Sequence, residues 1–311
     1  MKPLKFGIHL PTGDIAFQRI SDLAIKAERL GYDSLWVADH LVQKGRKAMP
    51  MSGGLFEPLI TLANLANVTS KTRLGTAILL PLRHPLLVAN MIATLDNASK
   101  GRITLGLGVG WMKGEFESLG ISYENRGKIA DETIEILKKV WTKNQTSYKG
   151  KHFQFDAITV NPKPLQKPYP PIWVGGNSNA AIRRTVSLGD GWIPTDYAVA
   201  EYEKGLEQLR KECAVRKRKT ETITVASHLY ISIAKSHEKA VKAIEFLAKM
   251  TGDPISEVEN WSIVGTPSEV EARIKQYVKA GVTHHIFSFP RTGSEEEAYE
   301  LLASEVISAF K

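Results

Sequence analysis

Short apolar runs alternate with amphipathic stretches along most of the chain. Residues 34–38 are mostly apolar and follow a Gly-Tyr-Asp turn, which predicts a buried parallel strand. Residues 17–30 carry apolar side chains at helical spacing, so they predict an amphipathic helix that ends at Gly31. This alternation continues to the end of the chain. The predicted strands are residues 5–10, 34–38, 73–81, 102–110, 171–176, 191–195, 223–233 and 284–289.

Eight strands that alternate with helices predict an α/β fold, a single (β/α)8 TIM barrel whose closure removes the sheet edges. We expect one domain over residues 1–311, and the second choice is an open doubly wound sheet. Residues 147–155 predict a small hairpin that turns on Gly150, and a proline-rich stretch follows. The barrel is therefore expected to carry an insertion at about 146–171, after the fourth strand. Residues 251–263 are expected to be irregular.

Composition and charge narrow the class of protein. Hydrophobic residues make up 43% of the chain and charged residues 24%, which is ordinary for a globular domain. The one cysteine, Cys213, excludes an intrachain disulfide and a multi-cysteine metal site. We see no signal peptide and no apolar run long enough to span a bilayer, so we predict a cytoplasmic protein without a membrane partner.

The net charge of +8 comes from 41 basic and 33 acidic residues. Such a balance attracts anions, including nucleic acid. However, the densest basic cluster, residues 210–219, has no interleaved aromatic residues and no nucleic-acid motif. We therefore expect a small-molecule substrate and no nucleic-acid partner.

Candidate chemistry gathers where the predicted strands end, because a barrel collects these ends on its functional face. Asp39 and His40 follow the second strand and form a possible acid–base pair. The alternative is a helix cap or a salt-bridged loop pair. His9 could join them in a metal site, but nothing fixes further ligands, so we expect no metal. The other strand ends carry Ala77-Ile78, Gly108 to Trp111, Gly175 to Ser178, Thr195, His228 and Ser288.

Two glycine groups suggest a flat, phosphorylated ligand. Residues 106–110 alternate glycine with other residues, so the backbone can approach a flat ring, yet they lack the spacing of a dinucleotide fingerprint. At Gly175-Gly176-Asn177-Ser178 a strand ends and a helix begins, which can form a phosphate cradle. The alternative here is a plain turn with an Asn or Ser helix cap.

Together these segments resemble the luciferase-like monooxygenase superfamily, and the resemblance covers essentially the whole chain. It rests on Ser34 to His40, Leu79 to Pro85, Gly106 to Trp111 with Glu115-Phe116, Pro162 to Pro164, Pro171 to Gly176 and Gly189 to Trp192. The resemblance implies a barrel with an insertion, flavin or deazaflavin (coenzyme F420) chemistry and a homodimer. It also implies a ring seated on a bulge with a non-proline cis peptide, here Ala77-Ile78, and a proton-handling role for Asp39 and His40.

The strand ends and the resemblance together predict three sets of site residues. The resemblance implies Asp39 and His40 as catalytic residues. Cofactor binding is expected at Asp39, Thr76, Ala77, Ile78, Gly108, Val109, Gly110, Gly175, Gly176, Asn177 and Ser178. Substrate contacts are expected at His9, Trp111 and Thr195.

The choice of cofactor rests on two motifs, one position and charge. The Val-Ala-Asp-His pattern and the Gly-Val-Gly-Trp-x-x-x-Glu-Phe motif resemble the deazaflavin branch. The luciferase branch has an arginine for the FMN phosphate where this chain has Val109, and the basic charge suits the polyglutamate tail of F420. We therefore expect F420-dependent hydride transfer to or from an unidentified small organic substrate. The glutamates of the sugar-phosphate dehydrogenases have no clear match. The alternatives are an FMNH2-dependent monooxygenase of the alkanesulfonate or luciferase type, which uses O2, and a cofactor carrier without activity.

Overall fold

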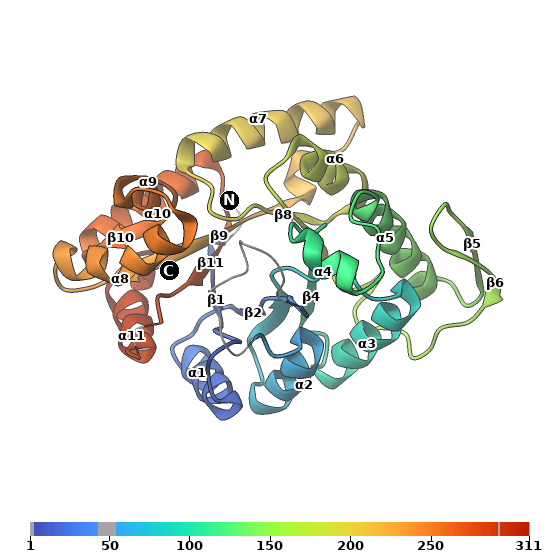
Figure 1. Cartoon of the computed structure of the whole chain (residues 1–311), viewed down its shortest axis with the longest axis horizontal. Helices are drawn as coiled ribbons and strands as arrows, with labels where there is room; N and C mark the ends of the chain where they lie inside the picture. Colours follow the sequence, from blue (N-terminus) through green and yellow to red (C-terminus); the bar gives the residue numbers. More distant parts are fainter. Residues whose placement is uncertain (1–2, 43–53, 292, 311) are drawn as a thin grey trace.

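Eight parallel strands close into a barrel in the computed structural model, which describes residues 3–42, 54–291 and 293–310 (Figure 1). β9 pairs with both β8 and β11, and this closes the ring. The predicted TIM barrel is therefore confirmed. The ring consists of β1 (Lys5–His9), β2 (Ser34–Val37), β3 (Arg73–Thr76), β4 (Ile103–Leu107), β7 (Ile172–Gly175), β8 (Gly191–Ile193), β9 (Thr224–Ile233) and β11 (His284–Ser288).

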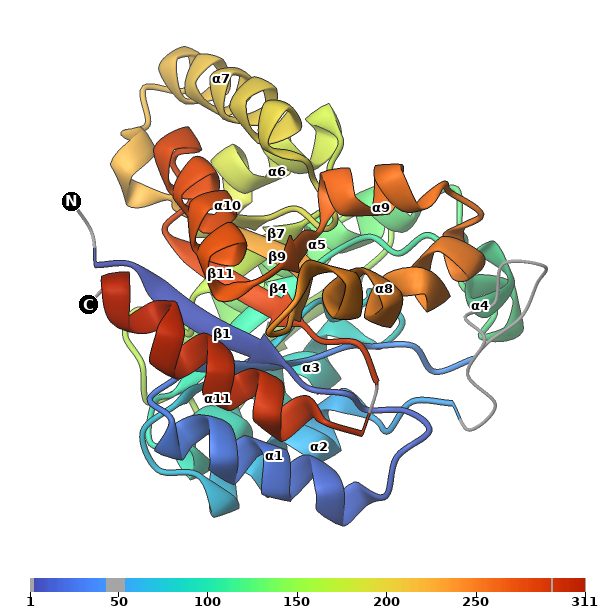
Figure 2. The same cartoon turned by 90° about the vertical axis from the view of Figure 1, so that its left-hand side faces the viewer.

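Helices surround the strands, as Figures 1 and 2 show. In α1 the predicted apolar face is buried against the sheet, with Ile20, Leu23 and Ala27 fully shielded from solvent. The helices are α1 (Phe17–Arg29), α2 (Pro58–Val68), α3 (Pro85–Ala98), α4 (Lys113–Ser118), α5 (Arg126–Thr142), α6 (Asn179–Leu188), α7 (Val199–Val215), α8 (His237–Thr251), α9 (Ile255–Trp261), α10 (Pro267–Ala280) and α11 (Glu295–Glu305), with the 3-10 turns η1 (Thr220–Thr222) and η2 (Ile307–Phe310).

Some expectations about secondary structure are wrong. The strands predicted over residues 73–81 and 102–110 end earlier, at Thr76 and Leu107. Residues 251–263, expected to be irregular, contain α9 and lead into β10 (Ile263–Gly265). β10 pairs in parallel with the end of β9, outside the barrel ring. The short α4 was also not predicted. Helices of one or two turns show too few repeats of the apolar pattern to stand out in sequence.

The predicted insertion contains the expected hairpin, formed by β5 (Thr146–Lys149) and β6 (Gln154–Ile158) in antiparallel pairing. The proline-rich stretch that follows is held against the amino ends of β3 and β4. Gln166 Nε2 donates to Ile103 O at 2.8 Å, and Arg73 Nη2 donates to Gln166 Oε1 at 3.1 Å. This stretch therefore lies at the barrel end opposite to the carboxyl ends of the strands.

Two tryptophans fill the interior of the barrel. Trp36 and Trp173 stack with ring centroids 5.1 Å apart, and His284 meets the Trp173 ring edge-on at 5.0 Å. Glycines make room for these rings: a Cβ at Gly191 would lie 2.6 Å from Trp173, and one at Gly75 would collide with Trp36. The lower half of the barrel is thus a packed core, and any ligand has to bind at the carboxyl ends of the strands.

Candidate active site

Asp39 lies two residues after the end of β2, and its side chain is fully buried. Its Oδ2 accepts hydrogen bonds from Arg83 Nη1 at 2.7 Å and from Leu80 N at 2.8 Å, and its Oδ1 accepts from Arg83 Nη2 at 3.0 Å. Burial raises the pKa of this carboxyl, while Arg83 acts in the opposite direction. Both oxygens of Asp39 are therefore engaged in holding the segment that follows β3.

His40, the next residue, turns to a different partner. Its Nδ1 lies 3.1 Å from Oε2 of Glu115, a fully buried residue of α4. A carboxylate only accepts, so Nδ1 carries the hydrogen and Nε2 is the ring atom left for a ligand. Glu115 Oε1 also accepts from the backbone N–H groups of Leu41 and Val42, at 2.6 and 3.1 Å. Glu115 thus fixes both the ring and the backbone after it.

The segment expected to seat a flat ring, Ala77-Ile78, lies beside this pair and is called the seat below. The peptide bond Ala77-Ile78 is cis, as the resemblance implied. The Ile78 side chain projects over two strand ends, where a Cβ on Gly108 would collide with it and one on Gly175 would lie 2.7 Å from it. These two predicted glycines are therefore needed to admit Ile78.

Backbone bonds pin the seat to both neighbouring strands. Ala77 N donates to Val37 O at 2.8 Å, and Leu79 N donates to Gly106 O at 2.7 Å. Thr76, predicted to bind the cofactor, is buried, and its hydroxyl donates to the same Gly106 carbonyl at 2.6 Å. Thr76 therefore supports the seat from below and does not face a ligand with its side chain.

The glycine turn after β7 is tied to the end of β8. Asn177 Nδ2 donates to Thr195 O at 2.8 Å, and Thr195 N donates to Asn177 Oδ1 at 3.0 Å. Ser178 caps α6 by accepting from Ala181 N at 3.2 Å. The helix cap that was the alternative prediction for this turn is therefore present, and Ser178 forms it. Gly176 has φ +125°, which suits glycine, and Asn177 and Ser178 are exposed at the start of α6.

Of the predicted residues that follow β4, Trp111 lies next to His40. The Trp111 ring meets His40 edge-on, with centroids 5.9 Å apart, and remains 49% exposed. Gly110 has φ +77°, and its carbonyl accepts from Arg126 Nε at 3.1 Å. Val109, between Gly108 and Gly110, is half-buried. These residues form a wall with one aromatic side chain available to a ligand.

Two imidazoles, those of His9 and His228, lie together at other strand ends of the barrel. The rings of His9 and His228 are 4.6 Å apart, and His228 Nε2 lies 2.9 Å from Ser288 Oγ. Burial is the largest cause of the lowered pKa of both, which is about 4 for His228. His9 Nε2 is buried without a hydrogen-bond partner among the described residues. His9, predicted to contact substrate, thus presents a neutral ring.

Several of these partners were missed as site residues in the sequence. Arg83 and Glu115 fall within segments that carried the family resemblance, but their roles depend on contacts with residues 44 and 75 positions away. Asp196 follows the predicted Thr195 and was not considered. The family resemblance was the one signal for Glu115, because its neighbours Lys113 and Glu117 are charged as well.

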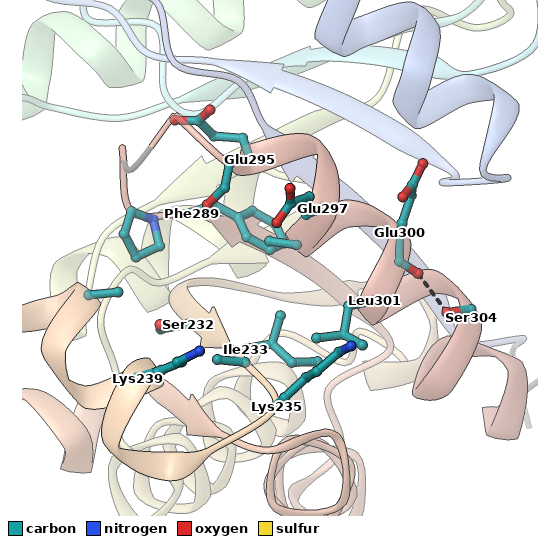
Figure 3. Close-up of a pocket in the computed structure, with 15 residues that line it drawn as sticks. Ser232, Ile233, Lys235, Lys239, Phe289, Glu295, Glu297, Glu300, Leu301 and Ser304 are labelled. Atoms are coloured by element: carbon teal, nitrogen blue, oxygen red, sulfur yellow. Dashed lines mark hydrogen bonds between the residues drawn. The ribbon is translucent and has the colours of Figure 1, made fainter.

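Two cavities lie beside the strand ends. One, of about 640 Å³ between α8 and α11, has Lys235 and Lys239 on one wall and Glu295 and Glu297 on the other (Figure 3), and it contains none of the predicted site residues. The second, of about 620 Å³, begins at Asp196.

Neither a metal cluster nor a membrane span is found in the described part of the chain. No three His, Cys, Asp or Glu side chains there come together as metal ligands. None of its helices is both long enough and apolar enough to cross a bilayer.

Several known proteins resemble this chain. Residues 3–255 match the family model described as luciferase-like monooxygenase. The chain is 28% identical to an F420-dependent glucose-6-phosphate dehydrogenase of Kineococcus radiotolerans, over 93% of this chain and 92% of that protein. It is 30% identical to an FMNH2-dependent dimethylsulfone monooxygenase of Pseudomonas putida, over 63% and 55% of the two chains.

Among solved structures, the coenzyme F420-dependent tetrahydromethanopterin reductase of Methanopyrus kandleri superposes with a TM-score of 0.85. That superposition covers 99% of this chain and 100% of the other, at 24% identity. This likeness concerns the fold.

Proposed function

The chain belongs to the luciferase-like monooxygenase family, and from that membership we propose that it transfers a hydride between coenzyme F420 and a small organic substrate. The observation that carries this proposal is the Ile78 seat beside an imidazole whose Nδ1 is bound to a buried carboxylate. The full-length similarity to an F420-dependent dehydrogenase supports the deazaflavin over FMN.

The residues present fit a deazaflavin. A flat ring requires a flat apolar support, which Ile78 supplies because Gly108 and Gly175 admit its side chain, and a neutral hydrogen-bonding rim, which His9 supplies. We propose that Ile78 and Val109 contact the ring and that the turn at Gly176 to Ser178, with the exposed start of α6, holds the phosphate. When bound, the deazaflavin supplies the two-electron chemistry.

The chain itself contributes positioning and proton handling. We propose that His40 exchanges a proton with the substrate oxygen or nitrogen at Nε2, while Glu115 keeps the hydrogen on Nδ1. Asp39 acts as a positioning residue, because both of its oxygens hold Arg83 and Leu80. The Ile78 side chain and the stacked indoles beneath it close the barrel below the ring to water.

The test compares the two cofactors directly. Purified protein is titrated with F420 and, separately, with FMN, and binding is followed by quenching of cofactor fluorescence. Micromolar binding of F420, with turnover of a member of an alcohol, imine and enone panel, is the expected result. Failure to bind F420 contradicts the proposal.

A second function has its own support, the similarity to an FMNH2-dependent monooxygenase over 63% of the chain. In that case the seat would hold reduced FMN, and the reaction would consume O2. Oxygen uptake with reduced FMN and an alkanesulfonate or a sulfone, together with selective FMN binding, would favour this alternative over hydride transfer.

We also propose that the enzyme is a homodimer that pairs through the outer faces of α2 and α3. These adjacent helices expose Ile60, Leu87 and Met91, which are 68%, 57% and 41% accessible. Their exposed positions contain no charged residue, although 24% of the whole chain is charged. An uncharged, apolar helix pair of this kind is typical of subunit interfaces. The cytoplasmic location stays a prediction.

A further inference from the structure

An acidic cavity adjoins the end of β8. It has a volume of about 620 Å³ and lies between the start of α7, α9 and α10. Its walls carry four carboxylates and one guanidinium in a chain whose net charge is +8. The lining residues are Asp196, Ala198, Val199, Ala200, Glu201, Glu203, Glu257, Asn260, Trp261 and Arg273.

Asp196 is the innermost acid of this cavity. Its Oδ1 is buried and has no hydrogen-bond partner among the described residues. Its backbone is held by a bond from Asp196 N to His228 O at 3.0 Å, in a left-handed conformation with φ +50°. A buried carboxylate oxygen without a partner is costly, so its retention points to a ligand that supplies the missing donor.

The one cation in the lining, Arg273, binds neutral acceptors. Arg273 Nη1 donates to Gln276 Oε1 at 2.8 Å, Nη2 donates to Asn260 O, and the guanidinium lies 5.6 Å from the Tyr277 ring. Glu201 is also engaged, because it accepts from Ala198 N at the start of α7. Neither engagement removes a charge, because these partners are neutral, so four carboxylates against one guanidinium leave the lining net negative once Asp196 is ionised.

An aromatic ring lines the same cavity. Trp261 is part of its wall and packs against Tyr230, with ring centroids 6.2 Å apart. Indole faces attract cations and repel anions. An aromatic wall and an unpaired carboxylate together suit a primary or secondary ammonium group, whereas a phosphate would meet like charge.

We propose that this cavity binds an ammonium group of the substrate, with Asp196 as its counter-ion and Trp261 as its aromatic wall. The inference rests on the proposed function for its role in turnover, and it specifies the substrate as an amine-bearing molecule. The cavity begins one residue beyond Thr195, whose carbonyl accepts from Asn177 at the glycine turn. The ammonium end of the substrate therefore lies to the side of the ring seat.

The test uses protein without cofactor and titrates it calorimetrically with n-hexylammonium, 1-hexanol and hexanoate at pH 8. Hexylammonium is expected to bind at least about tenfold more tightly than the other two, as one charge-assisted hydrogen bond can provide. D196N is expected to remove this preference, and E221Q, which changes an exposed acid outside the cavity, to retain it. Equal binding of hexanol, or unchanged binding by D196N, overturns the proposal.

Two further measurements keep the outcome decisive. If D196N does not fold, W261L replaces it and is expected to weaken hexylammonium binding at least threefold; unchanged affinity contradicts the proposal. F420 binding is measured separately on the wild-type protein. If the wild-type protein binds F420 but shows no preference for hexylammonium, the ammonium site alone is refuted. If it prefers hexylammonium but does not bind F420, the proposed function alone is refuted.

Discussion

Glu115 Oε2 lies 3.1 Å from His40 Nδ1, so a buried carboxylate of α4 fixes the imidazole at the end of β2. The same carboxylate accepts two backbone N–H groups, and this ties α4 to the strand end whatever is bound. Orientation of the ring therefore depends on a residue that was not predicted as part of the site. Removing it tests whether His40 acts as proposed.

E115Q is expected to lower kcat by about 10- to 100-fold with little change in F420 affinity, because the ring loses its charged partner but not its place. Turnover is followed in the deazaflavin absorbance band. Nitrogen NMR of His40 provides a second readout: a single Nδ1–H tautomer in the wild type and a mixture in E115Q. The control is E117Q, an exposed glutamate of the same helix. An unchanged tautomer and kcat in E115Q contradict the assignment.

R83M is expected to lower the free energy of unfolding by about 3–5 kcal/mol, because it leaves the buried Asp39 carboxylate without its cation. Urea denaturation measures this. K113M, which breaks an exposed pair with Glu117, should cost less than about 1 kcal/mol. D39N combined with R83M should be more stable than R83M alone. If R83M and D39N/R83M lose the same free energy of unfolding, the unpaired Asp39 carboxylate is not the cause of that loss.

G108A is expected to weaken F420 binding at least tenfold and to cost about 1–3 kcal/mol of stability, because the new methyl group collides with Ile78. Replacing Ile78 by alanine should relieve the collision. G108A/I78A should therefore lose less stability than the sum of the losses in the two single variants. Strict additivity in thermal or urea unfolding would mean that the two side chains do not share this space.

The buried Asp196 carboxyl makes stability depend on pH. Burial raises its pKa from 3.8 to about 7, so the folded state holds a proton that the unfolded state loses between these values. Stability contributed by this group is complete below about pH 4 and falls as the pH rises through 7. The neighbouring Tyr202, Tyr230 and Tyr277 all have raised pKa values and stay neutral in this range.

The free energy of unfolding of D196N, relative to that of the wild type, should therefore be larger at pH 8 than at pH 4, by at most about 4 kcal/mol. Urea unfolding at both values measures the difference. D253N changes an exposed acid and should show no such dependence. If the stability of D196N depends on pH in the same way as that of the wild type, Asp196 is not the source of this dependence.

I60E and L87E are expected to convert the protein into a monomer, because each places a charge in the apolar α2–α3 face. Light scattering after gel filtration gives the mass. L165E is the matched control, since Leu165 is 53% exposed on the insertion. A wild-type monomer, or a dimer that survives both changes, refutes the proposed interface.

Local patterns predicted the elements well where they were long. α1 spans Phe17–Arg29, close to the predicted residues 17–30, and Ser178 caps α6. The partners of the site residues were not predictable in this way. Arg83 meets Asp39 only because β2 and β3 pair, and Glu115 reaches His40 only because α4 packs against the end of β2. Such contacts depend on tertiary packing, which a single sequence does not display.

The stacked Trp36 and Trp173 have a consequence for the order of events. Both indoles are almost fully shielded, and they seal the axis of the barrel from beneath. Cofactor, substrate and product then all enter and leave through the open end of the barrel, at the carboxyl ends of the strands. Whichever molecule sits deepest has to enter first and leave last, so the kinetics should follow a compulsory sequence in which the smaller reactant arrives after the ring.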